Sequence, residues 1–345
     1  MPSVPFANVL EPAGQLFKRL MSTTHREPKL TVGLDIGSTS IKIIALGSRK
    51  GSGPRPIMAQ NLVPLSEDQE ADASEAIKSA MAALRLPVRT VNVGVSGQWV
   101  IMRVVEMPAL KPAEVKQALP FEAQRYLPFN VQDVVIDGEV LGPADENKLW
   151  VLIVACKKEL LERRIDWIRR AGLDLALIDV DALALANSFL EQSDGRKIEG
   201  TRAVLNVGAR LANLVIFQGS IPYLVRDIPW GGEKLYRSIA EQLGVEPLAI
   251  NDQFVKGEST PELLGAVKTA SEALVTEVQL SFDYFENRFG HPPEEIFISG
   301  GLSQLSLFLD ALKSHLTQAV NTWMPVSGLS GQFAVAYGLA LRTSS

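Results

Sequence analysis

The sequence predicts a two-lobed α/β fold in which a small α/β unit is inserted into the first lobe. Its 345 residues exceed the length of one typical domain. Short runs of β-branched and apolar residues alternate with stretches of helical periodicity, which is typical of α/β proteins. In addition, residues 203–217 align without gaps on residues 32–46. This internal repeat indicates that the two lobes carry related strand pairs, each joined by a glycine turn.

The composition is that of an ordinary globular protein, with 46% hydrophobic and 21% charged residues. A formal net charge of −5 disfavours general binding to polyanions such as nucleic acids. The single cysteine, Cys156, lies in the apolar run 149–156, so we expect a buried core residue and no disulfide. The scattered histidines do not have the spacing of zinc ligands. Without a long apolar run or a secretory signal, the protein is expected to be cytoplasmic.

The first lobe is expected to follow a leader. Residues 1–30 are predicted to be a flexible leader, although Leu10 and Phe17 would share one face of a short docking or membrane-surface helix. The core of the first lobe is then expected at residues 31–96. It opens with the strand pair 32–46, where apolar residues flank a turn of glycine and hydroxyl residues.

The inserted α/β unit is expected at residues 97–180. It begins with a strand near 98–107, followed by a helix that Pro112 opens. Pro120 lies inside this helix, so a kink or break is expected there. Strands near 131–140 and 148–155 follow.

A second helix of the inserted unit is predicted at 157–171, ahead of a strand at 175–180. Arginines crowd one face of this helix, and we expect that face to be solvated; a contact surface for an anion is the alternative. These arginines are Arg163, Arg164, Arg169 and Arg170.

The two copies of the repeat have the residues that a phosphate site needs. Asp35 aligns with Asn206 and Gly37 with Gly208, an offset of 171 residues. A hairpin turn presents backbone N–H groups to a phosphate, and glycine allows close approach. The hydroxyls at positions 38–40 add donors, and an acid such as Asp35 can hold a water bound to Mg²⁺. Two such turns facing each other would hold a triphosphate from both sides.

The second lobe is expected at residues 181–342. Besides its copy of the repeat, it contains a buried strand at 295–299 that runs into Gly300 and Gly301 and then into a helix. A glycine pair at such a turn suits close packing against a flat ring or a phosphate. Together with the two hairpins, this turn predicts a contact to adenosine.

These segments resemble the actin-like ATPase superfamily, whose fold is a duplicated, ribonuclease H-like α/β fold. Residues 35–42 resemble its first phosphate loop, 206–213 its second and 298–303 its adenosine motif. Within the superfamily, the chain is similar to the PilM family of type IV pilus assembly. The residues that carry this closer similarity are the runs 122–129, 226–232, 277–284 and 336–342, and the resemblance covers about residues 31–342.

The resemblance implies ATP and Mg²⁺ bound between the lobes, with a C-terminal helix at about 331–342 returning to the first lobe. It implies a nucleotide site made of Asp35, Gly37, Ser38, Thr39, Ser40, Lys42, Asn206, Gly208, Ala209, Gly231, Gly232, Gly300, Gly301 and Ser303. Asp35 would hold Mg²⁺ through water.

The resemblance also implies a place in a larger assembly. The inserted unit would bind the N-terminal tail of a PilN-like inner-membrane protein, which would keep the chain on the cytoplasmic side of that membrane and near the pilus motor ATPases. The implied partner residues are Glu122, Arg125, Tyr126, Leu127 and Phe129.

The second phosphate loop departs from the family pattern. Asn206 stands where an acidic residue is usual, and the turn 209–212 lacks the expected hydroxyl residues. The segment 251–256 likewise lacks the usual acidic and lysine residues. Asn206 supplies no negative charge for Mg²⁺ or for orienting a nucleophile, whereas Arg210 either pairs with a phosphate or points to solvent. We therefore expect nucleotide binding without efficient hydrolysis, and the catalytic residues stay unassigned.

Three other functions compete with this interpretation. A small-molecule kinase needs a general base, and no acid follows Gly208 until Asp227, which is expected to be a structural residue of a turn. A division protein resembling FtsA would end in a basic membrane helix, whereas this chain ends at Ser345. A pseudo-ATPase scaffold of a type II secretion-like machine is the nearest alternative, although a membrane helix usually follows in that family.

Overall fold

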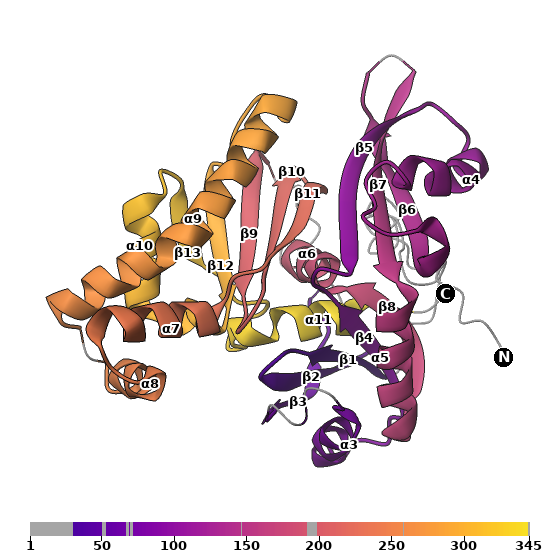
Figure 1. The fold of residues 1–345 in the computed structure, drawn as a ribbon. Coiled ribbons are helices and arrows are strands. Elements are labelled where there is room, and N and C mark those ends of the chain that lie inside the picture. Colours follow the sequence, from indigo (N-terminus) through magenta and orange to yellow (C-terminus); the bar gives the residue numbers. More distant parts are fainter. Residues whose placement is uncertain are drawn as a thin grey trace.

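The computed structural model contains two five-stranded sheets and a separate three-stranded sheet (Figure 1). It describes residues 30–49, 53–66, 69, 72–145, 147–191, 199–257 and 259–343. The leader predicted at 1–30 therefore lies outside the described residues except for Leu30, where the first strand begins. The two-lobed α/β fold with an inserted unit is confirmed.

The first lobe is built on a sheet with the strand order β3-β2-β1-β4-β8. Its strands are β1 (Leu30–Ile36), β2 (Ser40–Gly47), β3 (Ile57–Pro64), β4 (Thr90–Val95) and β8 (Asp174–Val180). Alternate residues of β2 face opposite layers, because side chains alternate along a strand. Ile41 and Ile43 share a core with α3 (Ser74–Ala83), whereas Ile44 and Leu46 pack with α11 (Ala334–Leu341).

The second lobe repeats this plan in full. Its sheet has the order β11-β10-β9-β12-β13, and each strand has the same parallel or antiparallel neighbours as its counterpart in the first sheet. The strands are β9 (Thr201–Val207), β10 (Ala212–Gln218), β11 (Ile221–Ile228), β12 (Glu295–Gly300) and β13 (Ala319–Thr322). The sequence repeat therefore marks one hairpin of a duplication that covers both sheets.

Helices cover both faces of the second sheet. One face packs with α7 (Gly232–Leu243), α8 (Pro247–Val255), α9 (Pro261–Phe289) and α10 (Ser306–His315). The other face receives α6 (Asp181–Glu191), whose Phe189 contacts the rings of Phe217, Phe297 and Trp323. The 3₁₀ turns are η2 (Val131–Asp133), η3 (Gly301–Gln304) and η4 (Gly331–Phe333).

Two helices, α6 and α11, cross between the sheets and join the lobes (Figure 1). A side chain at Gly338 of α11 would overlap the backbone carbonyl of Ala184 in α6. On the other side of α11, a side chain at Gly33 of β1 would overlap the carbonyl of Ala336. The absence of side chains at both glycines thus lets α11 lie directly against its neighbours.

The inserted unit is an antiparallel sheet with the order β5-β7-β6. It contains β5 (Val100–Pro108), α4 (Pro112–Ala123), β6 (Val134–Pro143) and β7 (Lys148–Lys157). The helix packs on this sheet through Val115 and Leu119. Cys156 is fully buried, as expected.

The structure differs from two expectations for this region: the break considered at Pro120 is absent, and the inserted unit is shorter than predicted. Helix α4 is not broken at Pro120 but continues to Ala123, because Pro120 lies in the last turn, where it disturbs only one helical hydrogen bond. The range 97–180 is also longer than the three-stranded unit. Strand β8 pairs with β4 of the first sheet, and α5 (Lys158–Arg170), which precedes it, packs on that lobe.

Candidate functional site

A cavity of about 790 Å³ lies between the lobes, and both glycine hairpins line it. Its volume is within the usual range for small-ligand sites. The hairpins therefore face one another across a shared space, as the repeat predicted. The residues of the predicted nucleotide site that line this cavity are Asp35, Gly37, Ser38, Thr39, Lys42, Asn206, Gly208 and Ala209.

The two hairpins have the same closing hydrogen bond. The backbone N–H of Gly37 donates to the carbonyl of Ser40 at 3.1 Å, and that of Gly208 donates to Leu211 at 2.9 Å. At each glycine a side chain would crowd that same carbonyl. Ser40 therefore closes the first turn with its backbone and is not among the residues lining the cavity.

The hairpins differ in the cross-strand pair that flanks the glycine turn. In the first, Lys42 Nζ forms an ion pair with Asp35 Oδ2 at 3.1 Å. In the second, Asn206 Nδ2 donates to Asn213 Oδ1 at 3.0 Å at the same two strand positions. The first hairpin thus presents a carboxylate and an ammonium group to the cavity, whereas the second presents two neutral amides.

Asn213 connects this pair to a buried carboxylate. Its Nδ2 donates to Asp227 Oδ1 at 2.7 Å, and the backbone N–H of Gly97 donates to Asp227 Oδ2 at 2.7 Å. Burial raises the pKa of Asp227 to about 6, while the bonds from Gly97 and Asn213 act in the opposite direction. Asp227 lies within strand β11 and not in the following turn. Asp227 belongs to β11 of the second lobe and Gly97 follows β4 of the first lobe, so this hydrogen bond joins the two lobes.

Sequence reasoning missed Asp181, which begins α6 and lines the cavity. Its Oδ1 is buried without a hydrogen-bond partner, and a side chain at Gly94 would overlap it. Burial raises the pKa of Asp181 to about 7, with a further contribution from the negative charge of Asp35. An acid directly after a parallel strand was the available signal, because ligands bind at the carboxyl ends of such strands.

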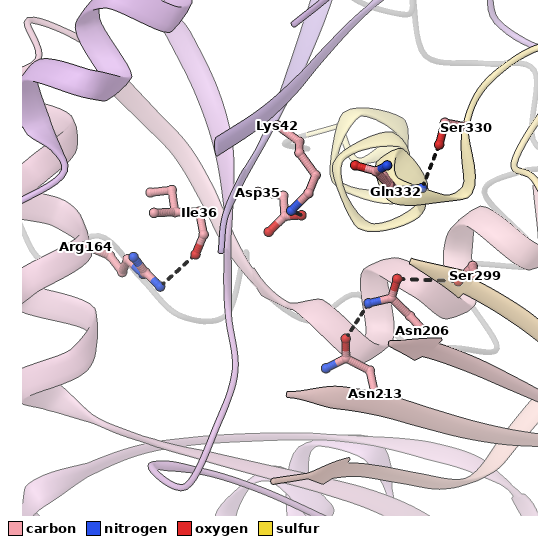
Figure 2. A network of polar contacts seen from close by, with 9 residues as sticks. All are labelled: Asp35, Ile36, Lys42, Arg164, Asn206, Asn213, Ser299, Ser330 and Gln332. Carbon is pink, nitrogen blue, oxygen red and sulfur yellow. Dashed lines mark hydrogen bonds and ion pairs between the residues drawn. The ribbon is translucent and has the colours of Figure 1, made fainter. Parts of the chain in front are cut away.

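The arginine face of α5 is only partly solvated. Arg164 turns inward, where its Nη2 donates to the carbonyl of Ile36 at 3.3 Å beside the first hairpin (Figure 2). Burial lowers the pKa of Arg164. Arg163 lies over the rings of Trp99 and Trp167 and lines the cavity with them. The expectation of a solvated face holds for Arg169 and Arg170, which are exposed, and fails for Arg164, because α5 packs against the first lobe.

The remaining glycines of the predicted site lie beside the second hairpin. The N–H of Gly232 donates to the carbonyl of Gly208 at 2.9 Å, so α7 begins directly on this hairpin. A side chain at Gly231 would crowd the same turn. Gly300 pairs with Val207 on the neighbouring strand and has a left-handed φ of 85°. None of these glycines is among the residues lining the cavity in the described part of the chain, nor are Gly301 and Ser303.

Two further side chains of this region are engaged within the protein. Arg210 Nε pairs with Glu233 at 2.8 Å, although it also lines the cavity. The hydroxyl of Ser303 turns back to the carbonyl of Gly300 at 2.7 Å.

The predicted partner residues lie in the last turn of α4 and in the segment that follows it, where Arg125 and Tyr126 are exposed and the other three are half-buried. Arg125 pairs with Glu122 at 3.1 Å, and Tyr126 is 41% exposed. Leu127 packs on the inserted unit, and Phe129 lies under the ammonium of Lys157 at 4.7 Å. Tyr126 also lines a second cavity of about 690 Å³ between β5, β11 and α9.

Among the residues that the structure describes, no group of three acidic, histidine or cysteine side chains is arranged to hold a metal ion. Mg²⁺ usually keeps several waters and binds through one or two carboxylates and substrate phosphates, so Asp35 and Asp181 fit that cation. None of the described helices is both long and apolar enough to cross a membrane.

A family model matches nearly the whole chain. The model for type IV pilus assembly protein PilM covers residues 33–344. Among solved structures, a PilM–PilN type IV pilus biogenesis complex is similar with a TM-score of 0.80 and 24% sequence identity, over 92% of this chain and 99% of that chain.

More distant structures share the fold alone. The ethanolamine utilization protein EutJ from Carboxydothermus hydrogenoformans matches with a TM-score of 0.54 and 14% identity, over 96% of this chain and 99% of that one. The cytoplasmic domain of EpsL, an inner-membrane component of the type II secretion system of Vibrio cholerae, has a TM-score of 0.50 and 14% identity. That match covers 92% of this chain and 96% of the EpsL domain.

Proposed function

Because the chain belongs to the family of type IV pilus assembly protein PilM, we propose that it is a cytoplasmic, nucleotide-binding component of a pilus assembly platform. The observation that carries the nucleotide-binding part is that both glycine hairpins line the same cavity. A ligand with a chain of phosphates would contact both lobes there, so its binding would favour one arrangement of the lobes.

The residues around the cavity suit ATP with Mg²⁺. The turns that follow Gly37 and Gly208 line the cavity, where their backbone N–H groups would donate to phosphate and Ser38 and Thr39 would add hydroxyl donors. Lys42 adds a positive charge beside Asp35. When bound, Mg²⁺ would neutralise phosphate charge, and Asp35 would hold it through water. The turn at 300–303 lies next to the second hairpin and is proposed to contact the adenosine.

We propose that hydrolysis is slow. Asn206 and Asn213 supply no negative charge on the second hairpin, so this side of the cavity has neither a second metal-holding acid nor a base for water. Both carboxylate oxygens of Asp227 accept hydrogen bonds from within the protein. The chain would therefore act as a switch that is set by nucleotide occupancy.

The proposed partner is the N-terminal tail of a PilN-like inner-membrane protein. Support comes from the similar PilM–PilN complex and from Arg125 and Tyr126, which are exposed on the inserted unit. Such a tail would hold the protein on the cytoplasmic face of the inner membrane, within reach of the pilus motor ATPases. A pseudo-ATPase scaffold of a secretion machine would share these features.

Titration with ATP and Mg²⁺ tests the nucleotide site. Asp35→Ala is expected to weaken binding by about tenfold, because it removes the acid proposed to hold Mg²⁺ and leaves Lys42 without its partner. The exposed Asp310→Ala on α10 is the control and should bind like the parent protein. Phosphate release should stay near background in all three. Unchanged affinity in Asp35→Ala would contradict the site.

A peptide copying the PilN-like tail tests the partner surface. Tyr126→Ala is expected to weaken peptide binding by about fivefold or more, since tyrosine is enriched among the few interface residues that supply most of the binding energy. Leu248→Ala on α8 removes another large exposed side chain, 81% exposed in the other lobe, and it should change nothing. Equal losses in both variants would argue against the assignment.

A small-molecule kinase is the second candidate, because one observation favours it. The buried carboxyl of Asp181 lines the cavity with a pKa of about 7, which suits a general base. ATP turnover with a panel of sugars would separate the two functions. Sugar-dependent turnover that Asp181→Ala abolishes would favour the kinase over the assembly switch.

A further inference from the structure

A series of hydrogen bonds runs from the second hairpin to the first lobe. Ser299 Oγ donates to Asn206 Oδ1 at 3.4 Å, and Asn206 Nδ2 donates to Asn213 Oδ1 at 3.0 Å (Figure 2). Asn213 Nδ2 then donates to Asp227 Oδ1, and the backbone N–H of Gly97 donates to Asp227 Oδ2, both at 2.7 Å. We call Asn206, Asn213 and Asp227 the relay. It begins at the cavity and crosses from the second lobe to the first.

The end of the relay sets the orientation of both amides. An ionised carboxylate only accepts hydrogen bonds, so Asn213 must turn its NH₂ group to Asp227 and its carbonyl to Asn206. Asn206 in turn must donate to Asn213 and accept from Ser299. One N–H of Asn206 then remains to bind an acceptor. Since Asn206 lines the cavity, the second hairpin offers a donor at the position where the first hairpin has Asp35.

The other end of the relay lies at a joint of the fold. Gly97 is in the turn between β4 and β5, which connects the first lobe to the inserted unit, and its φ of 97° is left-handed. It lines both the nucleotide cavity and the cavity next to the predicted partner segment. Its N–H bond to Asp227 therefore ties the second lobe to the base of the inserted unit.

We infer that Asp227 is a positioning residue, whose relay makes the second hairpin a phosphate-holding loop and couples nucleotide occupancy to the turn at Gly97. This inference rests on the proposed function and names how the same site is regulated. A phosphate oxygen that accepts the remaining N–H of Asn206 weakens the donation of this NH₂ group to Asn213, because one NH₂ group then serves two acceptors. Asn213 therefore donates less strongly to Asp227 Oδ1, and more negative charge stays on the carboxylate that accepts from Gly97. The bond from Gly97 to Asp227 becomes stronger, and the turn at the base of the inserted unit is held more tightly.

Amide hydrogen exchange, with and without ATP and Mg²⁺, measures this coupling in the full chain. In the parent protein, ATP is expected to protect both the first hairpin (35–42) and the turn 96–99. Asn213→Ala removes the middle of the relay but leaves the bond between Gly97 and Asp227. In this variant the hairpin should still be protected by ATP, and the ATP-dependent protection of the turn should be lost. The affinity for ATP should fall by about fivefold, as for one lost hydrogen bond.

Two further variants complete the design. Asp227→Asn keeps the shape but replaces one acceptor with a donor, so it should lose the ATP-dependent protection of the turn as well. Asn321→Ala is the matched control, because it removes a 2.9 Å bond between an amide and the carboxylate of Glu295 on the same sheet. That residue does not line the cavity, and the variant should behave like the parent protein. If Asn213→Ala does not fold, as judged by its melting curve, Asp227→Asn carries the test.

The outcomes separate the inference from the proposed function. If ATP protects the hairpin and the turn equally in Asn213→Ala and in the parent protein, the relay carries no coupling and the inference is wrong, while the nucleotide site stands. If ATP protects neither segment in the parent protein, the proposed function fails and the inference fails with it. A purely structural role for Asp227 would change exchange without ligand and leave the ATP-dependent difference in place.

Discussion

The two hairpins differ most at a single cross-strand pair. Lys42 and Asp35 form an ion pair in the first hairpin, and Asn213 and Asn206 form a neutral pair in the second. The change removes a negative charge from one side of the cavity and leaves it on the other. Because an uncharged amide neither attracts Mg²⁺ nor takes a proton from water, the exchange affects chemistry more than phosphate binding.

Two acidic residues of the inserted unit, Asp137 and Glu139, predict that the stability of the protein depends on pH. Glu139 and Asp137 lie two residues apart on β6, so their side chains share one face of the strand. Burial and, to a smaller extent, the negative charge of Asp137 raise the pKa of Glu139 from 4.5 to about 7, while Lys116 acts in the opposite direction. The folded state therefore holds a proton that the unfolded state has released above pH 4.5. This contribution to stability is lost as the pH rises from about 4.5 through 7.

Glu139→Gln removes this proton-binding site and is expected to raise the melting temperature at pH 8 by a few degrees. At pH 4, where Glu139 is protonated in both states, the variant and the parent should melt together. Melting curves between pH 4 and pH 8 check this, with Glu114→Gln on α4 as the control. A constant difference between variant and parent at every pH would show that protonation is not its cause.

At the scale of elements, the crossing of α6 and α11 has no room for side chains. Gly338 of α11 faces the backbone carbonyl of Ala184, which can move only if the helices separate. Phe189 of α6 is packed among aromatic rings of the second sheet, so that separation would disturb both lobes. The lobes are thus joined by two helices in backbone contact.

Gly338→Ala is therefore expected to lower the free energy of unfolding by about 3 kcal/mol. Gly265→Ala is the matched control, because this exposed glycine of α9 has no atom within 4 Å of a new side chain. It should stabilise the protein by about 0.5–1 kcal/mol, since alanine favours a helix over glycine. Urea unfolding of both variants measures the two changes. Equal effects of the two substitutions would mean that α11 is not tightly held at α6.

At the scale of the whole molecule, the duplication places two similar sheets on either side of one cavity. A ligand that contacts both hairpins binds the native arrangement of the lobes and not the unfolded chain. Such a ligand stabilises the native state by an amount that depends only on its concentration and affinity.

ATP with Mg²⁺ at one hundred times its dissociation constant is expected to stabilise the protein by about 2.7 kcal/mol. The melting temperature should rise accordingly, and Asp35→Ala at the same ATP concentration should show about half of that rise, because its tenfold weaker affinity reduces the stabilisation to about 1.4 kcal/mol. Thermal melts with ATP, with ADP and with Mg²⁺ alone make the comparison. A rise with Mg²⁺ alone that equals the rise with ATP would show that the cation, not the nucleotide, is bound.

Much of the fold and part of the site followed from local pattern in the sequence. The hairpins at 32–46 and 203–217 were predictable, because strand propensity and glycine turns are properties of neighbouring residues. Their equal spacing of polar residues indicated a common role and a shared cavity. The loss of negative charge in the second hairpin was also predictable, because the alignment of the repeat places Asn206 at the position of Asp35.

Only the tertiary structure decided which distant residues meet. Asp181, Arg164 and Asp227 come to the cavity or its edge from three separate elements, and no periodicity relates them to the hairpins. The assignment of α5 and β8 to the first lobe likewise depends on the pairing of β8 with β4, across an intervening unit. Local propensity acts between neighbours in sequence, whereas burial and charge act between neighbours in space. For this reason the chain's pattern specified its strands and turns, and the packing of the lobes specified the chemistry between them.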